Sequence, residues 1–472
     1  MIYEEGIIPT YSFPKNVVSM YISDNDGKPT YQIERGLDMA IGEYAPGRAI
    51  VVDKKTYQIG GLYYPGSERR NFQSPAKAFL EDANYLKGIR NCPDCEWFGL
   101  AVEDVKSCPF CGNKALQASL PMLKPWGFAP RNARAIQEAQ LSEEYSFTIP
   151  PLYSTLPDSE DIQQLQDYRN IRMAVRPNQR IIMLNKGVSD QGFTICNDCG
   201  AMMPGNTYKA LEDVGKPYIL KTSQKKCSHS NTTNVNLGYD FITDMLVLEF
   251  ALDNTRLDTR SKDSFWLRRA AQSLAEALRL SASQELDIEF TELVTGFRYR
   301  HQGNNAFVDI YLYDNLSSGA GYAVGVAGQM QRLLTRAESI LANCSGQCET
   351  ACHQCLKHYR NQNVHGLLDR FAALELLHWG RDGSCAAPLD YQNQCRLLLP
   401  IQDILEGHGI MIETKDGKLF ANSGRIQREI LIYPSMWREP ADTDALCISD
   451  ELLRFAKPVA VKKILKGVTT AL

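Results

Sequence analysis

The chain has 472 residues, of which 44% are hydrophobic and 22% are charged, a composition typical of a soluble globular protein with several domains. Its net charge is −4 and its pI is about 6.1, so any nucleic-acid surface must be a local patch rather than a chain-wide basic field. The N-terminus is acidic, and no apolar run approaches the ~18 residues of a membrane-spanning helix. We therefore expect a cytoplasmic protein.

The predicted elements indicate a mixed α/β fold built from several domains. Short strands are predicted for the N-terminal domain, which a cysteine-rich ribbon follows. A mixed segment then leads to an α/β core with strands at "DMLVLEF", "LDIEFTEL" and "AFVDIYLYD". The last segment contains the strand sequence "REILIYP" and a closing basic helix. In chain order the predicted domains cover residues 1–85, 86–115, 116–240, 241–400 and 401–472.

The fourteen cysteines are poor candidates for disulfides in a reducing compartment, so the clustered ones are better explained as thiolate ligands. The first group contains two CxxC motifs in "CPDCEWFGLAVEDVKSCPFCG", joined by a short apolar hairpin. Two such turns complete a tetrahedral sulfur shell that suits Zn2+ and leaves no open position for catalysis. This pattern predicts a structural zinc ribbon with the ligands Cys92, Cys95, Cys108 and Cys111.

A second group is formed by "CNDCG" and "KKCSHS", with a predicted hairpin or loop between them. Three thiolates and one imidazole also make a complete structural zinc shell. The alternative is that the second half of this group lies in an ordinary polar loop. The predicted ligands are Cys196, Cys199, Cys227 and His229.

The third group is "CSGQCETACHQC", and a long predicted helix leads directly into it. If that helix continued, the first three thiols would lie along one helical face. A single zinc ion and an iron–sulfur cluster are both compatible with the spacing. The predicted ligands are Cys344, Cys348, Cys352 and Cys355, whereas Cys385, Cys395 and Cys447 are interpreted as core residues.

Local groups of basic and aromatic residues are candidates for DNA contact. Phosphates attract cationic side chains, and aromatic rings stack on unpaired bases. For any one group, a solvated charged surface is the alternative interpretation. The candidates are Lys357, Tyr359 and Arg360 after the last cysteine, together with Arg268, Arg269, Arg298 and Arg300.

Two other kinds of site are weaker alternatives. The carboxylates of Asp287, Glu289, Asp309 and Asp314 would form a two-metal nuclease site if their strands brought them together. A solvated strand edge explains the first two equally well, and no lysine stands at a matching strand position. The backbone N–H groups of Ser317, Ser318, Gly319 and Gly321 in "NLSSGAGY" would cradle a phosphate, but a tight strand-to-helix turn requires the same glycines.

Seven sequences occur in order along the chain: "EEGIIPTYSFP", "IGEYAPGRAIVVDKKTY", "CPDC…CPFCG", "GFTICNDCG", "DMLVLEF", "YLYDNLSSGAGYA" and "C…C…C…CLKHYRNQ…H…LDR". Together they resemble the zinc-binding domain of unknown function at the C-terminal side of MrfA-type superfamily-two DNA helicases. The same domain occurs in DrmB-like proteins of DISARM phage defence. The resemblance spans almost the entire chain, and it implies that the third group of cysteines binds zinc.

The chain has no GxxxxGK[ST] phosphate loop and no DExH-type acidic box, so we expect the ATPase motor on a partner or on another part of a longer helicase. The resemblance implies a zinc-stabilised DNA-binding accessory module of a superfamily-two helicase in anti-phage defence. Its expected partners are single-stranded or junction DNA and the helicase motor, and its expected cofactors are two to three structural Zn2+ ions. The alternative is a scaffold that docks a helicase or another defence subunit without contacting DNA.

Overall fold

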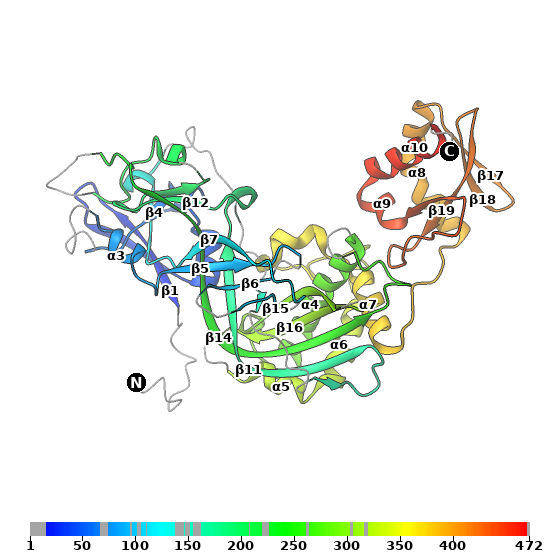
Figure 1. Cartoon of the computed structure of the whole chain (residues 1–472), viewed down its shortest axis with the longest axis horizontal. Helices are drawn as coiled ribbons and strands as arrows, with labels where there is room; N and C mark the ends of the chain where they lie inside the picture. The colour runs from blue at the N-terminus through cyan, green and yellow to red at the C-terminus, as the bar shows by residue number, and fades with distance from the viewer. Residues whose placement is uncertain are drawn as a thin grey trace. The chain divides into compact units, whose positions relative to one another are not determined.

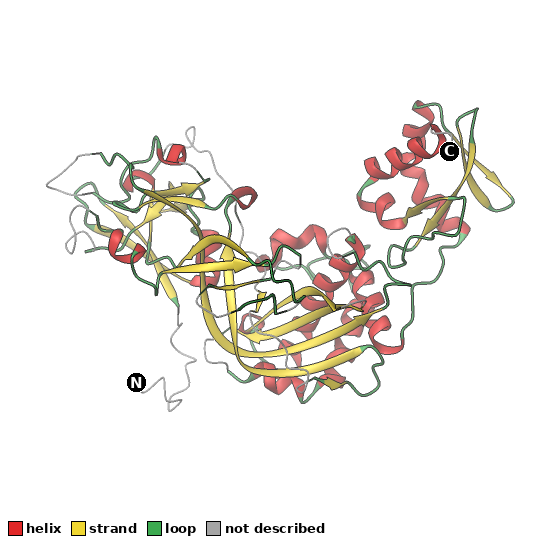
Figure 2. Ribbon diagram, in the orientation of Figure 1, coloured by secondary structure: helices red, strands yellow, loops and turns green. Residues whose placement is uncertain are grey.

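The computed structural model contains helices and strands throughout the chain (Figures 1 and 2). It divides into two compact units: unit 1 consists of residues 1–157, 176–245 and 313–322, and unit 2 of residues 158–175, 246–312 and 323–472. The division into five consecutive domains that we expect from the sequence remains a prediction. The described residues are 16–66, 74–94, 97–101, 105–109, 111–136, 146, 152–153, 162–206, 208–219, 226–260, 264–302, 305–315 and 320–469.

A five-stranded sheet in unit 1 has the order β2-β1-β8-β4-β3. β1 and β2 pair antiparallel, and β1 is buried along most of its length whereas β2 lies exposed at the edge. Met20, Ile22 and Ile59 are almost fully buried, which confirms the short strands predicted here. The elements are β1 (Val17–Ser23), β2 (Pro29–Gly36), α1 (Leu37–Glu43), β3 (Ala49–Val52), β4 (Lys55–Leu62) and β8 (Phe128–Pro130).

Two hairpins in unit 1 carry CxxC motifs. β5 (Leu86–Asn91) and β6 (Phe98–Leu100) pair antiparallel on either side of the first motif. β12 (Phe193–Cys196) and β13 (Met202–Pro204) pair on either side of "CNDCG". Each strand pair thus carries candidate metal ligands at its end. The other short elements of unit 1 are α3 (Lys77–Leu80), β7 (Gln117–Leu123), β9 (Leu152–Tyr153) and the 3-10 helices η2 (Arg131–Ala133), η5 (Val188–Asp190) and η6 (Tyr208–Leu211).

Two long strands connect the units along the chain, β11 (Ile171–Asn185) and β14 (Thr232–Leu252). β14 is buried over most of its 21 residues, and it contains the predicted strand "DMLVLEF", which is confirmed. In unit 2, β15 (Leu293–Gln302) and β16 (Asn305–Asp314) form a hairpin, and β16 pairs with β14. The short strand β10 (Gln163–Gln164) pairs with β11.

The central element of unit 2 is α4 (Phe265–Leu286), which the sequence predicts as an amphipathic helix. The Ser264 side chain caps its first turn by accepting a hydrogen bond from the N–H of Leu267. Its many alanines and serines are buried and let other elements approach closely. It contacts α6 (Met330–Ala342), α7 (Arg370–Asp382) and β15.

Two predictions about unit 2 and the adjoining turn are wrong. The sequence "LDIEFTEL" is not a strand: Asp287 ends α4 in the left-handed region with φ 52°, and a 3-10 turn, η7 (Phe290–Glu292), precedes β15. The reason is local, because the N–H groups of Asp287 and Ile288 both donate to the carbonyl of Ser283 and close the helix. The long helix before the third cysteine group is also interrupted, into α5 (Tyr322–Ala327) and α6.

The C-terminal part of unit 2 combines a four-stranded sheet, β17-β18-β19-β20, with three helices. β19 contains the predicted strand "REILIYP" and runs parallel to β20. Ile401, Ile430 and Ile464 lie in its hydrophobic core. Within the described residues, no helix has the length and apolar character needed to cross a membrane. The elements are α8 (Tyr391–Gly407), β17 (Met411–Lys415), β18 (Lys418–Asn422), β19 (Gln427–Tyr433), β20 (Leu446–Ser449), α9 (Asp450–Phe455) and α10 (Lys457–Thr469).

Candidate metal centres and an adjoining basic surface

The structure brings the four thiols of the third group, Cys344, Cys348, Cys352 and Cys355, within 4.8 Å of one another. Individual Sγ–Sγ distances are 3.5 Å between Cys344 and Cys352 and 3.7 Å between Cys348 and Cys355. Four ligands at ~2.3 Å around one tetrahedral zinc stand about 3.8 Å apart. In a cubane cluster each thiolate binds a different iron, so its ligands stand further apart. The geometry therefore favours a single ion over an iron–sulfur cluster.

The third group lies in a chain of turns rather than on a helix. α6 ends at Ala342, two residues before the first ligand, so the thiols do not share a helical face. Cys352 organises the last turn, because its carbonyl accepts hydrogen bonds from the N–H groups of Cys355, Leu356 and Lys357. Burial raises the pKa of the Cys355 thiol to about 12. That thiol therefore keeps its proton unless a cation lies beside it.

The second group also converges, with Cys196, Cys199, Cys227 and His229 within 4.8 Å of one another. The imidazole Nε2–H donates to the carbonyl of Val214 at 2.7 Å. Nδ1 is then the nitrogen with a free lone pair, and it lies 3.7 Å from the Sγ of Cys199. A backbone carbonyl that fixes the tautomer of a histidine in this way is typical of zinc ligation.

In the first group the structure places Cys92, Cys108 and Cys111 within 4.8 Å of one another. Cys92 and Cys111 are the closest pair, with 3.4 Å between their sulfurs. The predicted fourth ligand, Cys95, lies outside the described residues. Tight turns support the motif, since the N–H of Cys92 donates to the carbonyl of Trp97 and that of Gly112 to the carbonyl of Cys108. All three groups thus offer soft donors suited to zinc.

Directly after the third group, Lys357, Tyr359 and Arg360 form a surface that we call the post-knuckle surface. The Tyr359 ring is 69% exposed. Arg360 is exposed, and Lys357 is half-buried. Tyr359 and Arg360 lie at the start of η8 (Tyr359–Leu367), where His358 is the capping residue. The three predicted DNA-binding residues are thus held together on one short, capped segment.

The other four predicted DNA-binding residues are placed differently. Arg268 is exposed on α4. Arg269 is buried, where it pairs with Glu451 at 2.7 Å and stacks on the Phe455 ring. This corrects the expectation that both arginines face solvent. Arg269 therefore stabilises the packing of α9 on α4.

Arg298 and Arg300 lie on one face of β15 and are only 7% exposed. Arg298 donates to Asp309 at 3.0 Å, and Arg300 pairs with Glu249 and with Asp309. Their positive charges are therefore balanced inside the protein. Their burial argues against the predicted contact of these two arginines with DNA, because the face of β15 that carries them is covered.

The alternative nuclease site does not assemble in the described residues. Asp287 is the residue that ends α4, and Asp309 pairs with Arg298. Among the described residues, the groups with ligand atoms close enough to share an ion are the three cysteine groups, and none of them contains these carboxylates. Asp314 is fully buried, and its Oδ2 accepts hydrogen bonds from the N–H groups of Ala320 and Gly321, at 2.6 and 2.7 Å. The N–H of Gly321, one donor of the predicted phosphate cradle, is thus occupied by this carboxylate. The other predicted donors, Ser317, Ser318 and Gly319, lie outside the described residues.

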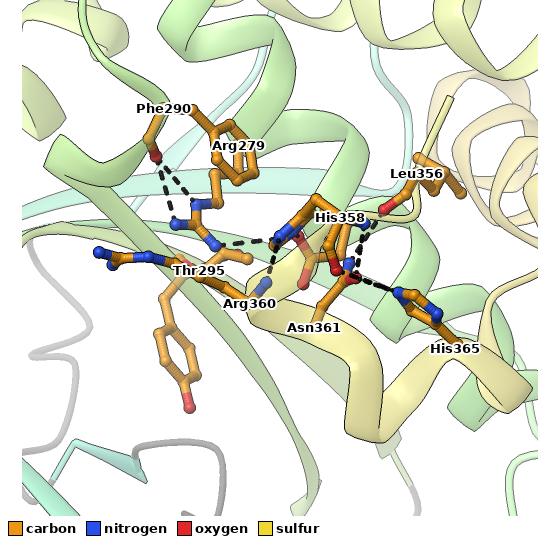
Figure 3. Close-up of polar contacts among 10 residues, drawn as sticks. Arg279, Phe290, Thr295, Leu356, His358, Arg360, Asn361 and His365 are labelled. Carbon is orange, nitrogen blue, oxygen red and sulfur yellow. Dashed lines mark hydrogen bonds and ion pairs between the residues drawn. The ribbon is translucent and has the colours of Figure 1, made fainter. Parts of the chain in front are cut away.

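Sequence reasoning missed the buried residues that support the post-knuckle surface. Glu276 on α4 is 5% exposed and accepts a hydrogen bond from His358 at 3.0 Å. Asn361 is 4% exposed, and its side chain bonds Leu356 and His365 (Figure 3). A glutamate among the alanines of α4 was the only signal in the sequence. Its partner lies 82 positions further along the chain.

The fold and its converged cysteine groups define a mixed α/β protein with a zinc-binding domain. Residues 269–356 match the MrfA Zn-binding domain family, which confirms the resemblance for that region. This region includes all four cysteines of the third group. The match ends where the post-knuckle surface begins.

The chain is also similar to the Druantia protein DruE of Escherichia coli (strain UMEA 4076-1), with 28% identity over 508 aligned positions. The alignment covers 98% of this chain and 27% of that protein, so the chain spans about a quarter of its relative.

Two crystal structures of the DUF1998 helicase MrfA resemble this chain only distantly. The one bound to DNA has 10% identity and a TM-score of 0.38, and covers 79% of this chain and 35% of MrfA. The one bound to DNA and AMPPNP has 8% identity and a TM-score of 0.31, and covers 76% of this chain and 32% of MrfA.

Proposed function

We propose that this chain is a zinc-stabilised DNA-binding module that works with a superfamily-two helicase motor in anti-phage defence, in the cytoplasm. The match of residues 269–356 to a domain of the helicase MrfA supports the helicase context. The similarity to a Druantia protein supports the defence context. In this proposal the three cysteine groups bind structural zinc, because complete thiolate or thiolate–imidazole shells leave no position for an activated water.

The observation that carries the proposal is the post-knuckle surface. An exposed tyrosine and two cations stand together on a capped segment that the third cysteine group anchors. The cations suit phosphates. The ring of Tyr359 can stack only on a base that is not already stacked in a duplex. Single-stranded DNA or a junction with unpaired bases is therefore the proposed ligand.

The test is the affinity of the whole chain for fluorescent single-stranded DNA over a range of salt concentrations. The variant Lys357→Ala/Tyr359→Ala/Arg360→Ala lacks two cations. Because each phosphate contact contributes ~0.7 to the slope of log K against log salt, this slope should become less steep by about 1.4. Loss of one stacked base should weaken binding by a further ~1–3 kcal/mol.

A matched control replaces another exposed tyrosine, arginine and lysine of unit 2. The variant Tyr391→Ala/Arg396→Ala/Lys415→Ala removes the same side chains from the C-terminal part, and its affinity and salt slope should match those of the wild-type chain. If the salt slope of the Lys357/Tyr359/Arg360 variant equals that of the control variant, the DNA-binding surface does not include the post-knuckle surface.

The scaffold alternative also has one structural observation in its favour. Leu399 and Ile404 on α8 are 67% and 48% exposed, and Met411 at the edge strand β17 is 55% exposed. Large exposed apolar side chains are candidates for contact with another protein. A chain that pulls down a helicase motor but shows no salt-dependent DNA affinity would favour this alternative.

A further inference from the structure

We infer that His358 is a positioning residue for DNA binding: it sets the direction of Tyr359 and Arg360 by joining their backbone to the buried carboxylate of Glu276. The inference rests on the proposed function, because it concerns how the same surface meets DNA. Neither the family match nor any motif in the sequence assigns this role to His358.

Both ring nitrogens of His358 are engaged (Figure 3). Nδ1 accepts a hydrogen bond from the N–H of Arg360 at 3.2 Å, and Nε2 lies 3.0 Å from a carboxylate oxygen of Glu276. Nδ1 must therefore carry the lone pair and Nε2 the proton. The His358 side chain thus caps η8 and also forms a hydrogen bond with a residue of α4.

The α4 side of this contact is itself fixed. Glu276 is 5% exposed, and Arg279 lies one turn further along the helix, 4.0 Å away. The guanidinium of Arg279 donates to the carbonyl of Phe290 at 3.2 Å and covers its ring. The Phe290 ring in turn meets the His358 ring edge-on, with 4.6 Å between centroids. The histidine ring therefore has a defined place.

Asn361 fixes the backbone between the third cysteine group and His358. Its Oδ1 accepts a hydrogen bond from the N–H of His358 at 2.9 Å, and its Nδ2 donates to the carbonyl of Leu356 at 2.9 Å. Leu356 follows Cys355 directly. The segment 356–361 is consequently a closed turn that directly follows the cysteine group and contains the His358–Glu276 contact.

A buried hydrogen-bond network selects one arrangement more sharply than an apolar contact, because sliding would break the hydrogen bond between His358 and the buried carboxylate of Glu276. Tyr359 and Arg360 are attached to that network through the backbone, yet their side chains are exposed. Such a surface loses little conformational entropy when it binds. His358 therefore contributes to affinity without contacting DNA.

The experiment compares single-stranded DNA affinity in the whole chain. His358→Asn keeps an oxygen that can cap the N–H of Arg360 but is too short to reach Glu276. Glu276→Ala removes the partner from outside the zinc segment, and Glu276→Gln keeps an acceptor. We expect both His358→Asn and Glu276→Ala to weaken binding about threefold to tenfold, as coupled neighbours do. We expect Glu276→Gln to stay within about twofold of wild type, and all three to retain the wild-type zinc content.

A combined variant supplies the readout that distinguishes positioning from general destabilisation. His358→Asn/Tyr359→Ala/Arg360→Ala should bind no more weakly than Tyr359→Ala/Arg360→Ala, because the histidine acts through these two residues. Fully additive losses, wild-type affinity in His358→Asn or Glu276→Ala, or zinc loss in either variant would overturn the inference while the proposed function stands. A wild-type chain without DNA affinity would overturn both.

Discussion

His229 donates a hydrogen bond from Nε2 to the carbonyl of Val214 at 2.7 Å, while its Nδ1 lies 3.7 Å from the sulfur of Cys199. The imidazole thus offers its one lone pair to the centre of the second cysteine group. His229 itself has a positive φ of 49°, a backbone conformation that is uncommon for non-glycine residues.

We predict that His229→Ala lowers the zinc content by about one ion per chain and destabilises unit 1 by several kcal/mol, because zinc binding contributes ~10–16 kcal/mol to small modules. His229→Cys should restore much of the zinc, since thiolate also ligates it. Elemental analysis and urea unfolding measure both effects. The control is His408→Ala at an exposed position, and equal zinc in His229→Ala and this control would contradict the second site.

The third group gives a separate prediction. Cys352→Ser should release close to one zinc per chain and make residues 340–365 sensitive to protease, because the turns between α6 and η8 have little apolar core of their own. Limited proteolysis with mass spectrometry locates the cleavage. Cys395→Ser, a change of a lone cysteine on α8, should leave zinc and cleavage unaltered. Iron with acid-labile sulfide in the wild-type chain would contradict the zinc assignment.

Asp314 should be important for stability rather than for catalysis. Its buried carboxylate accepts hydrogen bonds from three consecutive N–H groups, those of Ala320, Gly321 and Tyr322. Asp314→Ala leaves these donors without that acceptor and should cost about 3 kcal/mol or more, whereas Asp314→Asn should cost less because it keeps one oxygen. Urea unfolding checks the order, with Asp26→Ala as an exposed control in unit 1. Equal stability of Asp314→Ala and the control would refute this role.

Glu375 on α7 gives a pH-dependent prediction. Burial raises the pKa of its carboxyl to about 7, even though it accepts a hydrogen bond from the Trp266 indole at 2.7 Å. The folded state therefore binds a proton that the unfolded state has released, so stability falls as the pH rises from about 4.5 to about 7. Above that range the penalty is complete.

Glu375→Gln keeps the acceptor for Trp266 and removes the charge. We expect it to unfold at higher urea than wild type at pH 8, by about 1–3 kcal/mol, and to lose this advantage near pH 4.5. Unfolding followed by tryptophan fluorescence at several pH values measures the difference. Glu406→Gln at an exposed position of α8 should show no such trend. A Glu375→Gln chain less stable than wild type at pH 8 would contradict the prediction.

The cysteine groups could be predicted because each CxxC turn is a local constraint that the sequence displays directly. The burial of Arg298 and Arg300 could not. Alternation along a strand shows that two residues share a face, but not whether another part of the protein covers it. Their partners, Glu249 and Asp309, come from two other strands, so only the folded sheet reveals the ion pairs.

The end of α4 and the support of the post-knuckle surface were unpredictable for related reasons. "LDIEF" alternates as a strand does, but the hydrogen bonds that close α4 outweigh this weak local preference. The contact between Glu276 and His358 joins distant parts of the chain, and one sequence contains no signal that pairs them. The sequence thus predicted the three groups of residues that converge in the structure, whereas the contact between His358 and Glu276 required the structure.

The most direct test of the account is the affinity of the purified, zinc-loaded chain for a fluorescent DNA with a single-stranded overhang, measured by anisotropy from low to high salt. We predict binding at low salt that weakens steeply and linearly in log K against log salt, and a preference for the overhang over a blunt duplex of the same length. Absence of binding at low salt, in a chain with its full zinc content, would contradict the proposal that this protein is a DNA-binding module.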